Sequence, residues 1–452
     1  MKKISLTILS SLLITTASFS ATLGNKVTNN SLIVYNGNIG LVHEERTLKV
    51  DKNDKEIIYR GVANMIDTDS VNVELPKSVT LYSQQYRFDR LTQRKLLEAH
   101  INKQVIIKQL KDAKNFQKTK AKLLSANSAY CIVQTNKGDI LSVPSQNIIL
   151  KQIPKELITK PSLVWNIKTT KSLKSKMKID YLIKNINWRS NYILNIKQNK
   201  ANLVGFITVN NRSGKNFKNT KLYVLAGDIN QQQRPRTLYK AVKSMRYNNV
   251  PKVKERSYEG YHFYTIPSHV NIANNEKTQI KFIDKTDIPI QREYIARLNN
   301  PNYFNGESKQ NATQFIYIKN LDIVLPKGVV RTYSKLKNTN ILLGETNINH
   351  TPKNSPIKLK IGKNFDIQVT QSIVKRDDTK IYRDATIRYS VKNSSESSKN
   401  IQLLIPFNKN SNSTIDTQKT YIFTKGNLVT FNLKVGANST KSFNARFRTK
   451  VR

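Results

Sequence analysis

The feature that most constrains the fold is an alternation of apolar and polar residues with a period of two, which recurs along most of the chain. β-branched and aromatic residues occupy alternate positions, and short stretches rich in Asn, Gly and Lys separate the runs. This pattern is typical of β-strands joined by turns, because successive side chains of a strand point to opposite faces of its sheet. The sequence therefore predicts a mainly β protein: several β-sandwich modules of immunoglobulin-like type, a small barrel of the SH3 or Sm type, and little helix.

The predicted strands group into four modules behind a signal peptide. The small barrel is predicted from five short strands within about fifty residues, with Asn136, Lys137 and Gly138 forming a tight turn. The central module is interrupted by a long basic loop. The expected segments are a signal peptide at 1–20, an N-terminal β-sandwich at 21–98, the small β-barrel at 99–153, the central β-sandwich at 154–362 with its loop at 228–257, and a C-terminal immunoglobulin-like sandwich at 363–452.

The first twenty residues have the layout of a secretory signal. Positive charge in Met1–Lys3 precedes an apolar run at 4–14, and small residues Ser18 and Ser20 stand before Ala21. The apolar run is too short for a membrane-spanning helix of about 20 residues, and no later stretch approaches that length. We therefore expect a protein without a transmembrane segment that is exported to the periplasm, or secreted.

The charge of the chain makes an anionic partner the first class of ligand to consider. Seventy-six basic residues against 30 acidic ones give a formal net charge of +46. The excess has a second explanation, because the 56 lysines outnumber the 20 arginines and accompany abundant Asn and Ile, as codons rich in A and T would produce. Phosphate sites under selection favour the bidentate guanidinium of Arg. Both explanations stay open.

A candidate ligand surface combines the basic loop at 228–257 with the aromatic residues that follow it. Alternating basic and aromatic side chains can hold an anionic chain and stack on its rings. Two simpler interpretations compete: the loop is a solvated insertion, and the aromatic residues fill a β-sandwich core. The candidate surface consists of Arg234, Arg236, Arg246, Arg256, Tyr258, Tyr261 and Tyr264.

No motif of known enzyme chemistry is evident. The chain has no nucleophile elbow, phosphate-binding loop, dinucleotide fingerprint or zinc-protease helix. His262 and His269 are seven residues apart, which matches no common metal spacing, and Asp377 with Asp378 fits a turn better than a catalytic pair. The single cysteine, Cys131, excludes an internal disulfide and is expected to be buried and inert. We predict no catalytic, cofactor-binding or metal-binding residues, and hence no cofactor.

Two segments of the sequence resemble each other. In each, an apolar strand ends at Asn and Ser, a polar turn follows, and a second apolar strand begins. The segments are 207–213 with 221–224, and 387–395 with 401–404. Either two related sandwiches in series or shared turn chemistry explains this similarity.

Several motifs, in the same order, resemble an uncharacterised bacterial family known as domain of unknown function 4139, which includes mucoidy inhibitor A-like proteins. The similarity covers about residues 160 to 452, and more weakly 31 to 160. The motifs are YLIKNINWRSNY at 181–192, VNNRSG at 209–214, LAGDIN at 225–230, YHFYTIP at 261–267, LPKGVVRTY at 325–333, LLGETNINHTPK at 342–353 and IGKNFDI at 361–367.

The resemblance implies an exported β-rich protein and carries no established activity with it. The mucoidy name would connect the family with capsule or exopolysaccharide, although this chain has a compact segment in place of the long coiled coil of that subgroup. We expect a non-enzymatic protein that binds or scaffolds an envelope protein or polysaccharide. The alternatives are a periplasmic hydrolase with a site between sandwiches, and an electrostatic binder of lipopolysaccharide or another polyanion. Nucleic acid is not an expected partner of an exported chain, and the oligomeric state is not predicted.

Overall fold

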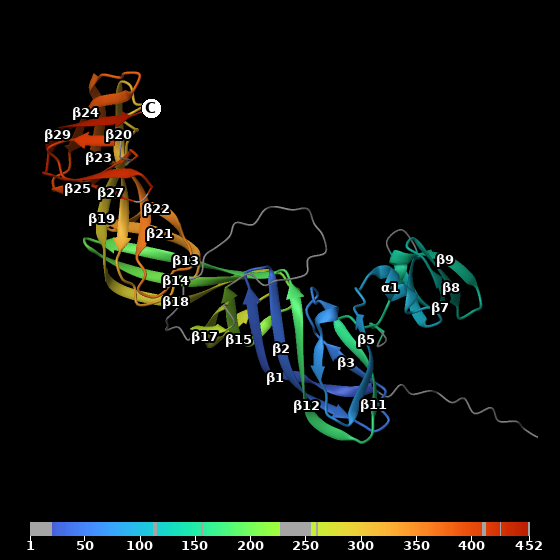
Figure 1. The fold of residues 1–452 in the computed structure, drawn as a ribbon. Coiled ribbons are helices and arrows are strands. Elements are labelled where there is room, and N and C mark those ends of the chain that lie inside the picture. The colour runs from blue at the N-terminus through green and yellow to red at the C-terminus, as the bar shows by residue number, and fades with distance from the viewer. Residues whose placement is uncertain are drawn as a thin grey trace, which may run out of the picture. The chain divides into compact units, whose positions relative to one another are not determined.

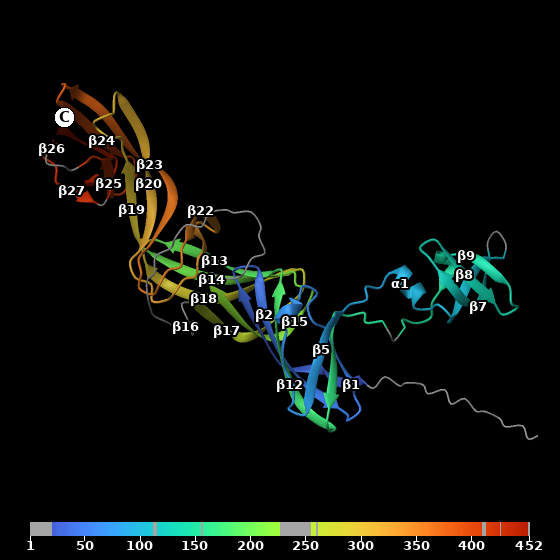
Figure 2. The ribbon, with the colours of Figure 1, turned by 45° about the vertical axis from the view of Figure 1, so that its right-hand side comes forward.

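The computed structural model describes residues 20–111, 115–154, 157–226, 255–258, 261–408, 413–424 and 426–450 (Figures 1 and 2). Strands contain 68% of the described residues and helices 3%. The predicted mainly β fold, with several sandwich modules and little helix, is confirmed. The chain forms two compact units: the first contains the residues up to Asn187 with Asn210–Val224 and Ile266–Lys277, and the second contains the rest.

The N-terminal module is built around a ten-stranded sheet. Its strands are β1 (Ser20–Tyr35), β2 (Ile39–Val50), β3 (Glu56–Arg60), β4 (Asn72–Glu74), β5 (Val79–Arg87), β11 (Ser162–Thr169), β12 (Leu173–Lys184), β15 (Phe217–Ala226), β16 (Glu255–Tyr258) and β17 (Tyr261–Ile272). β2 pairs with β1 on one side and β12 on the other, both antiparallel. A short 3-10 helix, η1 (Thr68–Ser70), precedes β4. Residues 21–98 thus do not form this sheet alone, because it recruits strands from beyond residue 160.

The small module, residues 99–153, is an excursion between two paired strands. β5 and β11 are antiparallel neighbours, with Arg87 opposite Ser162. The helix α1 (Gln93–Glu98) lies between β5 and this module. Its own sheet contains β6 (Gln104–Leu110), β7 (Phe116–Ala126), β8 (Tyr130–Thr135), β9 (Ile140–Pro144) and, after the 3-10 helix η2 (Ser145–Asn147), β10 (Ile148–Ile149). The five strands lie where the sequence predicts them, and Cys131 is buried in their core.

The second unit contains two further sheets. The first, of five strands, has β13 (Ile186–Lys197), β14 (Lys200–Asn211), β18 (Glu276–Pro289), β21 (Gly328–Leu336) and β22 (Thr339–Ile348). The second, of nine strands, has β19 (Gln291–Arg297), β20 (Glu307–Ile318), β23 (Ile357–Arg376), β24 (Tyr382–Asn393), β25 (Lys399–Pro406), β26 (Ser413–Asp416), β27 (Tyr421–Thr424), β28 (Leu428–Val435) and β29 (Ser439–Lys450). β13 and β21 pair in parallel. The predicted boundary at 362/363 falls inside the continuous strand β23, and β19 and β20 belong to the C-terminal sheet.

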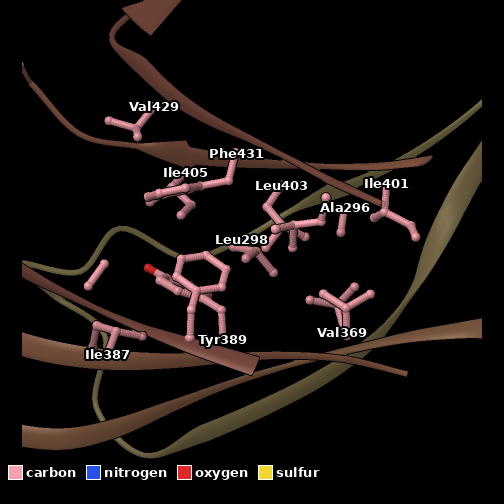
Figure 3. Close-up of a cluster of buried hydrophobic side chains, with 14 of the residues drawn as sticks. Ala296, Leu298, Val369, Ile387, Tyr389, Ile401, Leu403, Ile405, Val429 and Phe431 are labelled. Carbon is pink, nitrogen blue, oxygen red and sulfur yellow. The ribbon is translucent and has the colours of Figure 1, made fainter. Parts of the chain in front are cut away.

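The hydrophobic core of the C-terminal sandwich contains several aromatic side chains (Figure 3). Tyr389 on β24 lies opposite Phe431 on β28, with ring centroids 6.2 Å apart, and Phe443 on β29 lies 4.9 Å from Phe431. Figure 3 shows aliphatic side chains such as Leu403 and Val369 in the same core as Tyr389 and Phe431. Burial of this alternating face of each strand holds the two layers together.

One of the two similar segments forms a turn around a buried asparagine at the end of β14. The Asn211 side chain is 0% exposed. Its Oδ1 accepts hydrogen bonds from the backbone N and the Oγ of Ser213, at 3.0 and 2.7 Å. Its Nδ2 donates to Lys215 O at 2.8 Å and to Ala273 O, beyond the end of β17, at 3.2 Å. The amide thus fixes the turn and ties it to a strand end distant in sequence.

The second segment repeats this network at the end of β24. Asn393 is also 0% exposed, and its Oδ1 accepts from the backbone N and the Oγ of Ser395, at 3.1 and 2.7 Å. Its Nδ2 donates to Ser397 O at 2.9 Å and to Gly436 O, beyond the end of β28, at 2.7 Å.

The two segments also share an arrangement of strands. β14 neighbours β18 and β15 neighbours β17, as β24 neighbours β29 and β25 neighbours β28. The two segments are therefore similar both in the hydrogen bonds of their turns and in the pairing of the four strands around each turn.

Candidate binding site

Most of the ligand surface predicted from the sequence falls on residues whose side chains the structure does not describe. Arg234, Arg236 and Arg246 lie outside the described residues. Arg256 and Tyr258 lie on β16, and the backbone of Tyr258 is the register partner of Tyr261 on β17. The ligand-binding role of these residues stays a prediction.

Tyr264, the last of the predicted surface residues, is a buried residue of β17. Tyr264 is 1% exposed and Trp188 is 5% exposed, and their ring centroids are 6.2 Å apart. The Trp188 indole Nε1 donates to Leu225 O at 3.1 Å. The core-packing interpretation is therefore confirmed for Tyr264, which does not present its ring on an open surface.

The histidines do not assemble a metal site in the described residues. His262 stacks against His350, with ring centroids 3.8 Å apart, and the His350 ring lies 6.4 Å from that of Tyr264. Within the described ranges, no group of three or more His, Cys, Asp and Glu side chains is placed to hold a metal ion.

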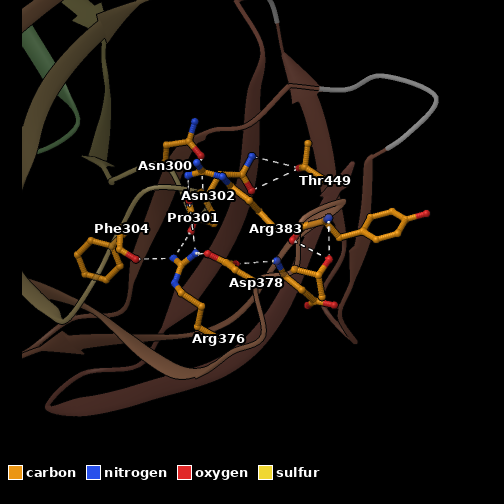
Figure 4. Close-up of polar contacts among 11 residues, drawn as sticks. Asn300, Pro301, Asn302, Phe304, Arg376, Asp378, Arg383 and Thr449 are labelled. Atoms are coloured by element: carbon orange, nitrogen blue, oxygen red, sulfur yellow. Dashed lines mark hydrogen bonds and ion pairs between the residues drawn. The ribbon is translucent and has the colours of Figure 1, made fainter. Parts of the chain in front are cut away.

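A polar cluster in the C-terminal sandwich has a structural explanation (Figure 4). The Arg376 guanidinium donates to the carbonyl oxygens of Pro301 and Phe304, at 2.8 and 2.6 Å, and pairs with Asp378 at 3.2 Å. Asp378 Oδ1 accepts from the backbone N of Asp384 at 3.1 Å. The predicted turn role of Asp378 is confirmed, and Arg376 clamps the 300–304 turn to β23.

The N-terminal module contains a charged cluster in its interior. The side chains of Glu44, Arg46 and Lys215 are 3%, 7% and 12% exposed. Glu44 Oε1 lies 2.8 Å from Lys215 Nζ, and Glu44 Oε2 lies 3.0 Å from Arg46 Nη2. Tyr59 donates its hydroxyl to Glu44 Oε2 at 2.6 Å, and its ring lies 3.9 Å from the Arg46 guanidinium carbon. Lys215 Nζ also donates to Gly61 O.

The alternation of β2 places two of these charges inside. Val42, Glu44, Arg46, Leu48 and Val50 occupy every second position of the strand, and all five are buried. Because alternate side chains share one face of a sheet, the apolar residues at both ends direct Glu44 and Arg46 into the core.

The third charge is positioned by the turn around Asn211. Gly214 has φ +80°, which glycine adopts without strain. A Cβ at this position would lie 2.4 Å from the Cβ of Asn64. Gly214 N donates to Asn274 Oδ1 at 2.8 Å. The turn thus fixes the backbone from which Lys215 reaches Glu44.

Burial and the neighbouring charges shift the pKa values of the members of this cluster. Burial alone would raise the pKa of the Glu44 carboxyl, but Lys215 and Arg46 outweigh it and hold that pKa below its ordinary value. Burial lowers the pKa of Lys215 despite the attraction of Glu44. Burial, reinforced by the Glu44 charge, raises the pKa of Tyr59. One carboxylate therefore faces two basic groups.

Two residues of this cluster, Glu44 and Lys215, line a polar pocket of about 340 Å³ in the first unit. The pocket lies where the register between β1 and β2 shifts, at Val27 and Asn29. Its other lining residues are mainly polar. They are Thr28, Asn29, Asn30, Asn216, Asn219, Lys218 and His269, with the apolar Val27 and Phe217.

Asn30 has an unused hydrogen-bond acceptor at this pocket. Its Nδ2 donates to Lys218 O at 3.1 Å. Its Oδ1 is buried and has no hydrogen-bond partner in the described part of the chain. A buried acceptor without a donor costs about 1–3 kcal/mol.

Sequence reasoning missed this pocket. A signal for it exists in β2, because Glu44 and Arg46 occupy core positions of a clear alternation. No local signal connects them with Lys215, which is distant in sequence.

Comparison of the chain with models of protein families and with curated proteins finds no match. Among the described residues, no helix has the length and apolar character needed to cross a membrane.

Proposed function

We propose that the protein is an exported, non-enzymatic binding protein of the cell envelope, and that its ligand is an acidic polysaccharide. The N-terminal sequence motivates export, as argued from its charge and apolar run. The observation that carries the choice of ligand is the pocket over Lys215, where cations outnumber carboxylates among amide and hydroxyl side chains.

The chemistry of the lining favours a charged sugar over an apolar ligand. Asn29, Asn30 and Asn219 offer both donors and acceptors, which match the hydroxyl groups of a sugar. Lys215 and Lys218 supply the positive charge that a uronate carboxylate or a phosphate substituent requires. The volume of about 340 Å³ lies at the small end of ligand pockets. The pocket therefore holds one sugar residue of a longer chain.

Titration of the purified protein with a short oligogalacturonate tests this proposal. We expect a dissociation constant of about 0.1 mM by isothermal titration calorimetry, and no binding of a neutral glucan of equal length. Lys218→Gln removes an exposed cation of the pocket, and Asn30→Ala removes an amide that lines it. Each substitution should weaken binding about five- to tenfold.

Lys168→Gln is the matched control, because Lys168 is exposed on β11 and does not line this pocket. Equal binding of the neutral glucan, or an effect of Lys168→Gln as large as that of Lys218→Gln, would contradict the proposal. Mass spectrometry of the oligosaccharide after incubation tests the hydrolase alternative. Shortened products would contradict the non-enzymatic proposal and support a hydrolase.

A further inference from the structure

The small module carries a concentrated positive charge. Between residues 99 and 153 the sequence contains nine lysines against Asp112 and Asp139, a formal excess of seven positive charges. Asp112 lies outside the described residues, and Asp139 accepts a hydrogen bond from Thr135 Oγ1 at 3.2 Å in the turn after β8.

Three of these lysines form a row along β7. Lys118, Lys120 and Lys122 occupy every second position and are exposed, whereas Ala121 and Leu123 between and beyond them are buried. The row therefore lies on the outer face of the sheet. In the described ranges, none of the three lysines forms an ion pair, so their charges are not neutralised within the module. Lys108 on β6 lies opposite Lys118 and extends the row to the neighbouring strand.

The same face ends in two exposed apolar side chains. Leu110 at the end of β6 is the register partner of Phe116 at the start of β7. Leu110 is 68% exposed and Phe116 is 54% exposed. Both are two residues from a lysine of the row, Lys108 and Lys118, and so share its face. Lys108 Nζ lies 3.7 Å from the centroid of the Phe116 ring.

We propose that this face of the small module docks on an anionic lipid bilayer. The lysine row lies against lipid phosphates, and Leu110 with Phe116 enters the boundary between headgroups and acyl chains. Basic residues beside exposed apolar ones are the combination that holds a protein on such a surface, because each lysine adds electrostatic attraction and each apolar side chain adds burial. We assign an anionic bilayer as the partner because its charge complements the lysine row and its acyl region accommodates the two apolar side chains at one end of the row.

The phosphates of a nucleic acid would pair with the lysines, but a nucleic acid would not bury Leu110 and Phe116. Bases stack on exposed aromatic faces, whereas one face of Phe116 is covered by Lys108. Leu110 offers no ring for stacking, yet it is more exposed than Phe116. A bilayer uses both side chains.

Cosedimentation with vesicles tests the proposal. The purified protein should bind vesicles of phosphatidylcholine with about 30% phosphatidylglycerol and leave vesicles of pure phosphatidylcholine unbound. The triple variant Lys118→Gln, Lys120→Gln, Lys122→Gln should bind about 100-fold more weakly. The double variant Leu110→Ser, Phe116→Ser should bind at least about tenfold more weakly.

The control variant removes the same charge elsewhere. Lys168→Gln, Lys174→Gln and Lys197→Gln replace three lysines that are exposed on β11, β12 and β13. Equal loss of binding in both triple variants would show that the net charge of the whole chain attracts the vesicle, and would overturn the assignment of this face. Unchanged binding of the Leu110→Ser, Phe116→Ser variant would also overturn it.

Insertion can be observed directly with Phe116→Trp. The native tryptophans, Trp165 and Trp188, are 0% and 5% exposed, so an exposed tryptophan at position 116 should dominate any change in emission. A blue shift on phosphatidylglycerol vesicles is expected. An unshifted spectrum at a lipid concentration that binds the protein, or equal binding of single-stranded DNA with a matching quench, would contradict docking on a bilayer.

Discussion

The substitution Glu44→Gln is expected to lower the free energy of unfolding by about 3–5 kcal/mol. Glutamine keeps the shape of the side chain but removes its charge. Arg46 and Lys215, at 7% and 12% exposure, are then left in the interior without a carboxylate. Desolvated charges without a partner are far more costly than exposed ones, so the loss exceeds that of an ordinary hydrogen bond. Urea denaturation of the variant and the unsubstituted protein measures the difference.

The matched control is Glu74→Gln, which breaks an exposed pair. Glu74 and Lys178 are 61% and 45% exposed, with 3.1 Å between carboxylate and ammonium. Exposed pairs contribute about 0–1 kcal/mol, so this variant should stay close to the unsubstituted protein. If the two variants lost equal free energies of unfolding, the charges of the Glu44 cluster would be effectively solvated.

The same cluster predicts a dependence of stability on pH. The pKa of Glu44 is lowered in the folded protein. Its contribution is therefore present above the ordinary carboxyl pKa of about 4.3 and is lost as pH falls through the lowered value. The difference between the unsubstituted protein and Glu44→Gln should shrink below about pH 4. The lowered pKa of Lys215 makes stability rise with pH between that lowered value and the ordinary lysine pKa of about 10.4.

Asn393→Ala should destabilise the C-terminal sandwich by about 3 kcal/mol. The alanine leaves the backbone N and the Oγ of Ser395 without their acceptor, and the carbonyl oxygens of Ser397 and Gly436 without their donor. These groups surround a side chain that is 0% exposed, so water does not replace it without a rearrangement of the turn. Thermal or urea unfolding measures the loss.

Two further variants separate the parts of this network. Asn393→Asp keeps an acceptor for Ser395 but turns a carboxylate toward carbonyl oxygens, and it should destabilise the protein at least as much as alanine does. Asn432→Ala, at an exposed position of β28, should change stability by less than about 0.5 kcal/mol. If Asn393→Asp were as stable as the unsubstituted protein, donation to the carbonyl groups would not be what fixes the turn.

Local structure is predictable here because strands and turns depend on neighbouring residues. The tight turn at 136–138, between β8 and β9, lies where its turn residues place it. Sheet membership is not local. β11 joins β5 and β3 across the small module, and β13 pairs in parallel with β21. Side-chain periodicity specifies which face is buried but not which strand lies next to it, so the expected module boundaries differ from the observed sheets.

In the candidate site, too, local features are predictable from the sequence and long-range contacts are not. Glu44 and Arg46 are detectable as charges at core positions of β2. Their partner Lys215 comes from a turn whose geometry depends on Asn211 and Gly214, and nothing near Lys215 in sequence distinguishes it from the many lysines on the surface. In contrast, the buried state of Trp188 and Tyr264 follows from the preference of aromatic residues for the core of a β-sandwich.

The position of the small module has a consequence for how this chain can change over time. Because Arg87 lies opposite Ser162, the two ends of the intervening segment emerge side by side from one antiparallel pair. Asp89 N donates to Ile158 O at 2.8 Å, and Ile158 N donates to Asp89 Oδ2 at 2.9 Å, just outside that pair. The segment between Arg87 and Ser162 therefore starts and ends at neighbouring positions of the sheet, as the loop of a β-hairpin does. Evolution can therefore lengthen, replace or remove the insert without shifting the register of the strands that carry it.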